Sequence, residues 1–433
     1  MINQDYFKNK KITVIGLGRS GFACATLLDN LNAQVSVSEK NKNPQILAYA
    51  KQLSPSINQE LGGHTSQFIK GRDLIVVSPG VDQSSQPLAW AREFAIPIIS
   101  EIECAWILCP GRIIAITGTN GKTTTSTLVG RVLEQAGKKT FILGNIGIPF
   151  SAYVSKIQPG DFISLEVSSF QLETIRRFKP YISVILNFTP DHLDRYSDLS
   201  KYLAAKSRIF MNQDESDYLV LNRHDQVASD FADKAKAKVV YFDSSMHSNL
   251  NFAAVKAVAS VLSIDMNLCQ DVLGRFVGLP HRLERIAEFQ GREFINDSKA
   301  TNPDATAFAL SNIEKPIILI AGGKDKGFDF SLFKVAICQK AKALIILGEA
   351  KNKIRKIFKM ELPITEVSDL VEAVNSAFRQ SQTGDCILFS PMCSSFDMFR
   401  DYEHRGEVFK AAVRNLTGRT DPRAQGEEIN ISS

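Results

Sequence analysis

The sequence lacks a cysteine metal motif, a membrane span and a strong net charge. Its seven cysteines are scattered with no Cys-x-x-Cys pair, which excludes a cysteine zinc site or redox pair and indicates a reducing compartment. No apolar run approaches the roughly 18 residues of a membrane span, and the first residues are polar rather than those of a signal peptide. The net charge is +5 over 433 residues, too little to indicate nucleic-acid binding. We therefore expect a cytoplasmic monomer that binds neither membrane nor nucleic acid.

The composition and the residue pattern indicate a large α/β protein. Hydrophobic residues make up 44% and charged residues 22%, which is ordinary for a globular protein. Buried-strand runs alternate with helical stretches, as in parallel sheets with helices on both faces. Strands are predicted at 11–16, 34–38, 74–78, 96–100, 112–117, 161–167, 181–187, 218–222, 238–242, 293–296, 316–321, 343–347 and 386–390. Helices are predicted to begin near residues 22, 123 and 251.

This length predicts about three domains. We expect a Rossmann-like N-terminal domain over 1–100 and a central P-loop-type domain with a mostly parallel sheet over 101–278. A C-terminal Rossmann-like α/β domain follows over 279–433. Its polar, aperiodic tail, from about residue 418, is expected to be disordered.

The strongest local signal is a glycine-rich loop between an apolar strand and a helix. It reads Gly118, Thr119, Asn120, Gly121, Lys122, Thr123 and Thr124. In a P-loop, backbone N–H groups face the phosphates, the lysine reaches the outer ones, and the hydroxyl after it ligates magnesium. The first glycine of the common pattern would fall at Ile116, and the chain has Gly118 instead. An ordinary glycine-rich turn is the alternative, but the full set of features favours ATP binding.

A second glycine-rich loop lies near the N-terminus. Gly16, Gly18 and Gly21 fit G-x-G-x-x-G, and Glu39 ends the next strand, where an acid meets a ribose hydroxyl. The arrangement suits NAD or a nucleotide sugar such as a UDP compound, because both offer a diphosphate and a ribose. The motif alone does not choose between them, and glycines required only for packing are a third interpretation.

Residues near the strand ends of the central domain indicate a magnesium site. Glu166 ends one strand and Asp191-His192-Leu193-Asp194 follows another, on the sheet edge where ligands bind. Magnesium prefers oxygen ligands, so Thr123 and Glu166 suit it and His192 is a less usual addition. A lone histidine is more often structural, but its acidic neighbours favour a ligand here. Lys206 lies in a helical pattern and is either a surface lysine or one that reaches the metal.

Three loops at strand ends of the C-terminal domain are rich in small, polar and charged residues. They cover residues 296–303, 321–327 and 390–397, and the first two carry lysine. We predict anion sites there rather than core.

Together these segments resemble the Mur ligases of peptidoglycan synthesis over nearly the whole chain. The resemblance rests on the phosphate loop and on LEVSSFQLE, DHLDRY, PHRLE, NDSKATNP, GGKDKG and SPMCSSFDMFRDYEHRG. Within the family, Asp297-Ser298-Lys299 points to the branch that adds D-glutamate. The resemblance implies an ATP- and Mg²⁺-dependent amide ligase that joins D-glutamate to UDP-N-acetylmuramoyl-L-alanine. The reaction would pass through an acyl phosphate and release ADP and phosphate, in cytoplasmic peptidoglycan precursor synthesis.

The resemblance also implies a role for each matching residue. Catalysis would depend on Lys122, His192 and Lys206, the last as a carbamylated lysine. The metal would be held by Thr123, Glu166, His192 and Lys206. ATP would be bound by residues 118–124 and by Asn145, Asn249, Arg282, Asp297 and Lys299. The UDP substrate would be bound by Gly18, Arg19, Ser20, Glu39 and Gly80, and D-glutamate by Thr301, Lys326, Ser395 and Tyr402.

The sequence departs from the family pattern at three places. The adenine segment, HN-x-x-N in the family, is matched by residues 248–252, which keep only the first asparagine, Asn249. Glu39 and Tyr402 stand where aspartate and phenylalanine are common.

Other functions are open at this stage. A folylpolyglutamate-type ligase is opposed by Asp297-Ser298-Lys299 and by the N-terminal domain. A Mur ligase for another amino acid is a second alternative, and a non-catalytic nucleotide switch is a third. An NAD oxidoreductase, suggested by the first loop, lacks any recognisable hydride-transfer site.

Overall fold

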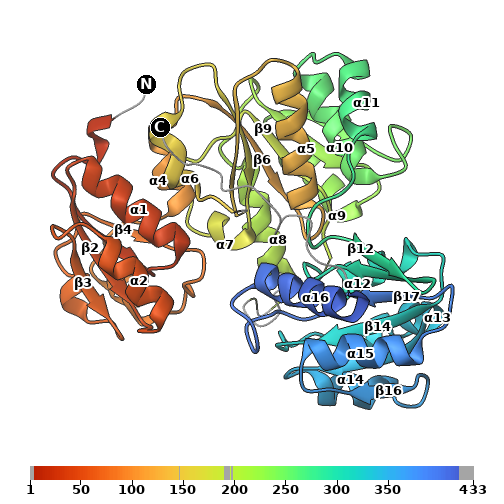
Figure 1. Cartoon of the computed structure of the whole chain (residues 1–433). Helices are drawn as coiled ribbons and strands as arrows, with labels where there is room; N and C mark the ends of the chain where they lie inside the picture. The colour runs from red at the N-terminus through yellow and green to blue at the C-terminus, as the bar shows by residue number, and fades with distance from the viewer. Residues whose placement is uncertain (1–3, 146, 190–195, 197, 419–433) are drawn as a thin grey trace. The chain divides into compact units, whose positions relative to one another are not determined.

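The computed structural model describes residues 4–145, 147–189, 196 and 198–418, which form two compact units, one ending at Phe276 and one starting at Val277. Strands alternate with helices along the chain and form three sheets (Figure 1), so the predicted α/β class is confirmed. All seven cysteines are free. Among the described residues, no helix is both long enough and apolar enough to cross a bilayer. The predicted tail lies beyond residue 418, outside the described residues.

The first sheet has five parallel strands in the order β3-β2-β1-β4-β5. Its strands are β1 (Lys11–Ile15), β2 (Gln34–Glu39), β3 (Asn58–Leu61), β4 (Leu74–Val77) and β5 (Ile98–Ser100). Its helices are α1 (Arg19–Asn30), α2 (Pro44–Gln52) and α3 (Gln86–Glu93). The inner strands β1 and β4 are largely apolar and buried because both of their faces are covered, as in parallel sheets, whereas the edge strand β3 is polar.

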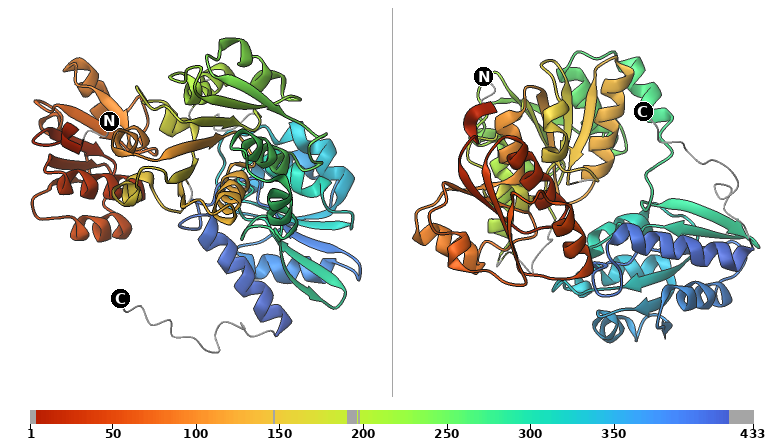
Figure 2. Two further views of the ribbon diagram at one scale, coloured as in Figure 1. Left: turned by 90° about the horizontal axis from the view of Figure 1, so that it is seen from above. Right: turned by 60° about the vertical axis from the view of Figure 1, so that its left-hand side comes forward.

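The second sheet has six parallel strands in the order β11-β10-β9-β6-β8-β7. Its strands are β6 (Arg112–Thr117), β7 (Thr140–Gly144), β8 (Phe162–Glu166), β9 (Ile182–Ile185), β10 (Tyr218–Asn222) and β11 (Lys238–Phe242). Its helices are α5 (Lys122–Gln135), α6 (Phe150–Tyr153), α7 (Ser169–Leu172), α8 (Leu199–Ser207), α9 (Gln226–Ser229), α10 (Leu250–Val261) and α11 (Met266–Gly274). Helices α5, α10 and α11 pack together against one face, side by side in Figures 1 and 2.

The first two sheets share a continuous core through helix α4 (Glu101–Leu108). Helices α1 and α6 pack against α4, one from each sheet. The buried carboxylate of Glu103 accepts hydrogen bonds from the backbone N–H groups of Arg176 (3.0 Å), Arg177 (2.8 Å) and Phe178 (2.8 Å). This contact fixes α4 to the second sheet, so the two sheets form one unit.

The C-terminal unit contains a six-stranded sheet in the order β12-β13-β17-β14-β15-β16, parallel except for the β12–β13 pair. Its strands are β12 (Glu284–Phe289), β13 (Arg292–Asn296), β14 (Ile317–Gly322), β15 (Ala341–Leu347), β16 (Ile364–Glu366) and β17 (Cys386–Phe389). Its helices are α12 (Pro303–Ser311), α13 (Lys334–Lys340), α14 (Lys351–Phe358), α15 (Leu370–Gln380) and α16 (Tyr402–Thr417). Short 3₁₀ turns in the chain lie at Gln4–Tyr6, Ser66–Phe68, Val154–Lys156, Arg208–Phe210, Ala232–Lys234 and Phe330–Phe333.

The predicted strands all form, with ends that differ by a few residues. Helix α1 begins at Arg19 rather than near residue 22, because Gly18 supplies an extended N-cap. The sequence pattern did not predict β3, β7, β12 and β16, and each of these strands lies at the edge of its sheet.

Candidate active site

The phosphate loop connects the end of β6 to the start of α5. Gly118 and Gly121 have φ angles of +150° and +83°, which favour glycine, and Gly121 is the N-cap of α5 without a capping side chain. Helix α5 is 14 residues long, and Thr123 lies buried in its first turn. The predicted strand–loop–helix arrangement is therefore present, and it directs a helix N-terminus toward the loop.

Two lysines lie against this loop. Lys122 Nζ donates to the backbone oxygens of Gly118 (2.8 Å) and Thr119 (2.6 Å). Lys206 Nζ, from α8, also donates to Gly118 O (2.8 Å) and lies 3.5 Å from Thr117 Oγ1. Lys206 is only 2% exposed. The sequence left the place of Lys206 open between the surface and the metal site. In the structure it is buried, and its side chain donates to the phosphate loop.

Glu166 lies at the end of β8, in register with Ile116 on β6. Its side chain is buried, and Oε1 accepts a hydrogen bond from Asn145 Nδ2 (2.9 Å). Asn145 N also donates to Glu166 O (2.9 Å). The predicted Asn145, Glu166 and Lys206 therefore all lie around the end of β6, whereas His192 falls outside the described residues.

The predicted UDP-binding residues gather at the carboxyl edge of the first sheet. Gly18, Arg19 and Ser20 follow β1, Glu39 ends β2, and the exposed Gly80 follows β4. The Glu39 carboxylate is fixed by the backbone, since Oε2 accepts from Leu17 N (2.7 Å) and Oε1 from Asn41 N (2.7 Å). Glu39 therefore shapes the glycine loop itself.

In the C-terminal unit, Asp297 is buried at the end of β13. Ser390 Oγ donates to Oδ2 (2.8 Å) and Leu283 N to Oδ1 (3.2 Å). Burial raises the pKa of Asp297 to about 7, although these hydrogen bonds and the nearby Arg282 and Arg405 charges oppose the rise. A carboxyl group with such a pKa is typical of functional sites.

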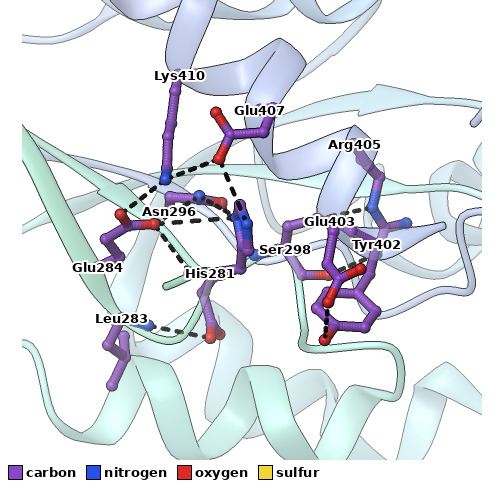
Figure 3. Close-up of polar contacts among 11 residues, drawn as sticks. His281, Leu283, Glu284, Asn296, Ser298, Tyr402, Glu403, Arg405, Glu407 and Lys410 are labelled. Carbon is purple, nitrogen blue, oxygen red and sulfur yellow. Dashed lines mark hydrogen bonds and ion pairs between the residues drawn. The ribbon is translucent and has the colours of Figure 1, made fainter. Parts of the chain in front are cut away.

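A buried arginine joins two loops of the C-terminal unit, and Figure 3 shows it beside Ser298 of the first. Arg405 donates to Ser298 Oγ (3.1 Å), Ser298 O (2.7 Å) and Cys393 O (3.0 Å). Burial lowers its pKa to about 10. The predicted Lys299 lies one residue after Ser298, and its ammonium is 4.7 Å from the centre of the Tyr402 ring.

The remaining predicted residues of this unit lie near the same loops. Thr301 precedes α12, Ser395 is buried two residues after Cys393, and Lys326 follows β14 in the glycine-rich loop. Gly323 of that loop has no room for a side chain, because a Cβ would lie 2.4 Å from Ser394 O. Two of the three predicted loops are thus in close contact.

A second network fixes the segment that carries Arg282 (Figure 3). The His281 ring accepts at Nδ1 from Asn296 Nδ2 (2.9 Å), while Nε2 lies 3.5 Å from Glu407 Oε1. Lys410 Nζ bridges Glu284 Oε1 (2.8 Å) and Glu407 Oε1 (3.0 Å). Burial lowers the pKa of His281, so the neutral ring is favoured. His281 and Glu284, which flank Arg282 in the chain, are thereby joined to the end of β13 and to α16.

Comparisons with known proteins identify the family. Three family models match in succession: a Mur ligase MurD-like N-terminal domain over residues 10–100, a Mur ligase middle domain over 116–273, and a Mur ligase glutamate ligase domain over 281–393. The UDP-N-acetylmuramoylalanine–D-glutamate ligase of Caldanaerobacter subterraneus is 38% identical, covering 94% of this chain and 99% of that protein. The ligase of the same name from Thermoanaerobacter pseudethanolicus is 40% identical over the same shares. This chain belongs to the Mur ligase family.

Solved structures show the Mur ligase fold without distinguishing its branches. The UDP-N-acetylmuramate–alanine ligase of Thermotoga maritima has a TM-score of 0.61 at 19% identity, covering 94% of this chain and all of that one. A bifunctional folylpolyglutamate synthase/dihydrofolate synthase of Yersinia pestis has a TM-score of 0.54 at 16% identity, covering 70% of this chain and 89% of that one. The fold is common to ligases with different substrates, so it does not select one.

Two asparagines beside the phosphate loop of this Mur ligase were not predicted as site residues. Asn249, the predicted adenine contact, caps α10 by accepting from Asn251 N (3.0 Å) and Phe252 N (3.4 Å). Asn251 instead lies against the phosphate loop, where its Oδ1 would be 2.1 Å from a Cβ at Gly121. Asn187 bonds the loop from the other side. Their signal in the sequence was position alone: Asn251 lies in the first turn of a helix and Asn187 follows a strand.

Proposed function

We propose that this Mur ligase joins D-glutamate to UDP-N-acetylmuramoyl-L-alanine at the expense of ATP. The observation that carries the proposal is the likeness over 94% of the chain to relatives named for that reaction. The phosphate loop and its lysines supply the chemistry of an ATP-dependent ligase. Asp297-Ser298-Lys299 at the end of β13 is the feature that favours D-glutamate over other amino acids.

The proposed reaction activates a carboxylate, which is a poor electrophile. The γ-phosphoryl group of ATP passes to the L-alanyl carboxylate, ADP leaves, and the amine of D-glutamate attacks the acyl phosphate to give amide and phosphate. Lys122 would hold the transferring phosphoryl group. Its ammonium donates to two backbone carbonyls of the loop, and phosphate oxygens can take the place of these acceptors. Asn145 would orient Glu166 and contact the phosphates from β7.

The residues present fit a magnesium ion. Thr123 offers a hydroxyl in the first turn of α5 and Glu166 a buried carboxylate at the end of β8, both hard oxygen donors. We propose these two and His192 as its ligands. When bound, the ion would neutralise the phosphate oxygens brought together with the substrate carboxylate.

Lys206 is proposed to carry a carbamate. Its ammonium and that of Lys122 both donate to Gly118 O, so two cations converge on one carbonyl. Addition of CO₂ to the neutral amine, with loss of a proton, would replace one cation by an anion that can ligate the metal.

The other site assignments belong to the same proposal. UDP binding is assigned to Gly18, Arg19, Ser20, Glu39 and Gly80. ATP binding is also assigned to Arg282, Asp297 and Lys299, and D-glutamate binding to Thr301, Lys326, Ser395 and Tyr402. For adenine, the position of Asn251 beside Gly121 adds it as a candidate next to Asn249.

We also propose a division into domains near residues 100 and 278. The three sheets lie within the corresponding segments, which supports both boundaries. A cytoplasmic location and a monomeric state complete the proposal.

The test is phosphate release from Mg²⁺ and ATP with UDP-N-acetylmuramoyl-L-alanine. D-glutamate, L-glutamate, other amino acids and no amino acid are compared, with Lys122→Met as the inactive control. Release that requires D-glutamate supports the proposal. Release with a different amino acid, or with a reduced folate in place of the UDP sugar, would replace it by another ligase of the superfamily.

A further inference from the structure

Asn187 follows the end of β9, and its side chain forms hydrogen bonds with the backbone of the phosphate loop. Its Oδ1 accepts hydrogen bonds from the backbone N–H groups of Thr119 (3.1 Å) and Asn120 (2.9 Å). Its Nδ2 donates to the backbone oxygen of Asn120 (3.1 Å), and its own backbone oxygen accepts from Thr119 N (3.0 Å). One residue thus bonds donors and an acceptor of the same short stretch of loop.

The loop needs such an external hold. Gly118 and Gly121 flank Thr119 and Asn120 with positive φ angles, and glycine loses more conformational freedom on ordering than any other residue. The β6–β9 pairing ends just before this point, at the hydrogen bond from Leu186 N to Thr117 O (3.0 Å). The Asn187 carboxamide therefore takes over from the β-ladder where the strands stop.

A second contact from the same segment supports this arrangement. Thr119 Oγ1 donates to Thr189 O and accepts from Thr189 N, both at 3.0 Å. Residues 187–189 consequently fix the backbone and the side chain of Thr119 together. The backbone N–H groups of Thr119 and Asn120 point to the Asn187 side chain, which fixes their orientation.

We propose that Asn187 is a positioning residue for ATP, because its carboxamide holds the loop in the shape that receives the phosphates. This inference rests on the proposed role of the loop in ATP binding. Asn187 acts through the loop backbone, and a loop that is already ordered loses less entropy when its ligand binds. Its loss should therefore weaken nucleotide binding more than binding of the UDP sugar or D-glutamate.

The experiment is calorimetric titration of the full chain with Mg²⁺ and the non-hydrolysable analogue AMP-PNP, in wild type and Asn187→Ala. We expect Kd for AMP-PNP to rise at least tenfold, while Kd for UDP-N-acetylmuramoyl-L-alanine stays within twofold. In steady-state assays KM for ATP should rise at least tenfold and KM for D-glutamate should stay within twofold. A merely structural role would not separate the substrates in this way.

Asn222→Ala is the matched control. Asn222 ends the neighbouring strand β10, and its carboxamide bonds Leu186 O (3.2 Å) and His224 N (3.0 Å) instead of the loop. We expect this variant to keep its affinity for AMP-PNP within twofold. Equal losses in the two variants would overturn the inference, because they would show general loosening of the sheet.

Two further outcomes are decisive. Wild-type affinity for AMP-PNP in Asn187→Ala overturns the positioning role, whereas failure of the wild type itself to bind AMP-PNP overturns the ATP function of the loop and the inference with it. Should the alanine variant not fold, Asn187→Leu decides by the same criterion. Leucine is neutral and close to asparagine in size but makes none of the side-chain bonds to Thr119 and Asn120, so wild-type affinity in that variant would refute the proposal.

Discussion

Replacing Asp297 by asparagine should stabilise the protein at alkaline pH. The carboxyl group is buried at the end of β13, and its hydrogen bonds come from Ser390 Oγ and Leu283 N. Asparagine has the same shape, keeps an oxygen for Leu283 N, and can donate its Nδ2 to the Ser390 hydroxyl. Only the cost of holding a buried negative charge is removed.

The sign and size of the effect follow from the pKa of Asp297, which rises from 3.8 to about 7 on burial. A carboxyl group with a raised folded-state pKa contributes stability that is fully present below pH 4 and is lost as the pH rises to 7. At about 1.36 kcal/mol per pH unit, the full loss is about 4 kcal/mol. The asparagine variant lacks this loss, so Asp297→Asn should gain about 3 kcal/mol relative to the wild type between pH 5 and pH 8.

The assay is urea unfolding of the full chain at pH 5 and pH 8, followed by hydrogen exchange of β13 and β17 to report on this unit. Comparing the two proteins at each pH cancels the titration of all other groups. Asp385→Asn is the control, because it breaks an ion pair with Lys342 (2.8 Å) and should lower stability. If the difference between wild type and Asp297→Asn does not widen from pH 5 to pH 8, the buried-charge reasoning is refuted.

Substitutions at four other residues test the site and its supports. Lys122→Met should lower kcat by about 10²–10³-fold with an unchanged melting temperature, and near-normal turnover would remove it from catalysis. Glu103→Gln should lower the free energy of unfolding by about 2 kcal/mol, because it disturbs three hydrogen bonds from backbone N–H groups. Glu101→Gln should lower it less, because burial already raises the pKa of Glu101 and only one backbone N–H bond is affected. Arg405→Met should cost about 3 kcal/mol by leaving buried carbonyls without a donor, with partial recovery in Arg405→Lys; equal stability of the three proteins in urea would contradict this.

The fold was largely predictable because its central strands are continuous apolar runs. Strands β1, β4, β6 and β14 are buried on both faces, and burial of that kind leaves an unmistakable pattern. The four missed strands are all edge strands. Asn58–Leu61, for example, has no fully buried residue and pairs on one side only, so nothing in its local sequence demands a strand.

The candidate site divides along a similar line. Residues with reactive or charged side chains at strand ends could be proposed as site residues from the sequence, such as the phosphate loop, Glu166 and Asp297. Residues that act through hydrogen bonds to distant backbone could not. Asn187 lies 67 positions from Asn120 and Arg405 lies 107 from Ser298, and neither separation has a local signature.

Lys122 and Lys206 show why residue type alone does not assign a role. Both ammonium groups donate to Gly118 O at 2.8 Å, so they have the same charge and share an acceptor. Lys122 is partly exposed on the loop, whereas Lys206 is buried with its ammonium 4.7 Å from the centre of the Tyr202 ring. Phosphate oxygens are stronger acceptors than carbonyls, and they can draw Lys122 away because its partly exposed side chain has room to follow them. Lys206 is buried and has no such room, so the roles proposed for the two lysines differ: Lys122 follows the phosphoryl group, whereas Lys206 acts from a fixed position.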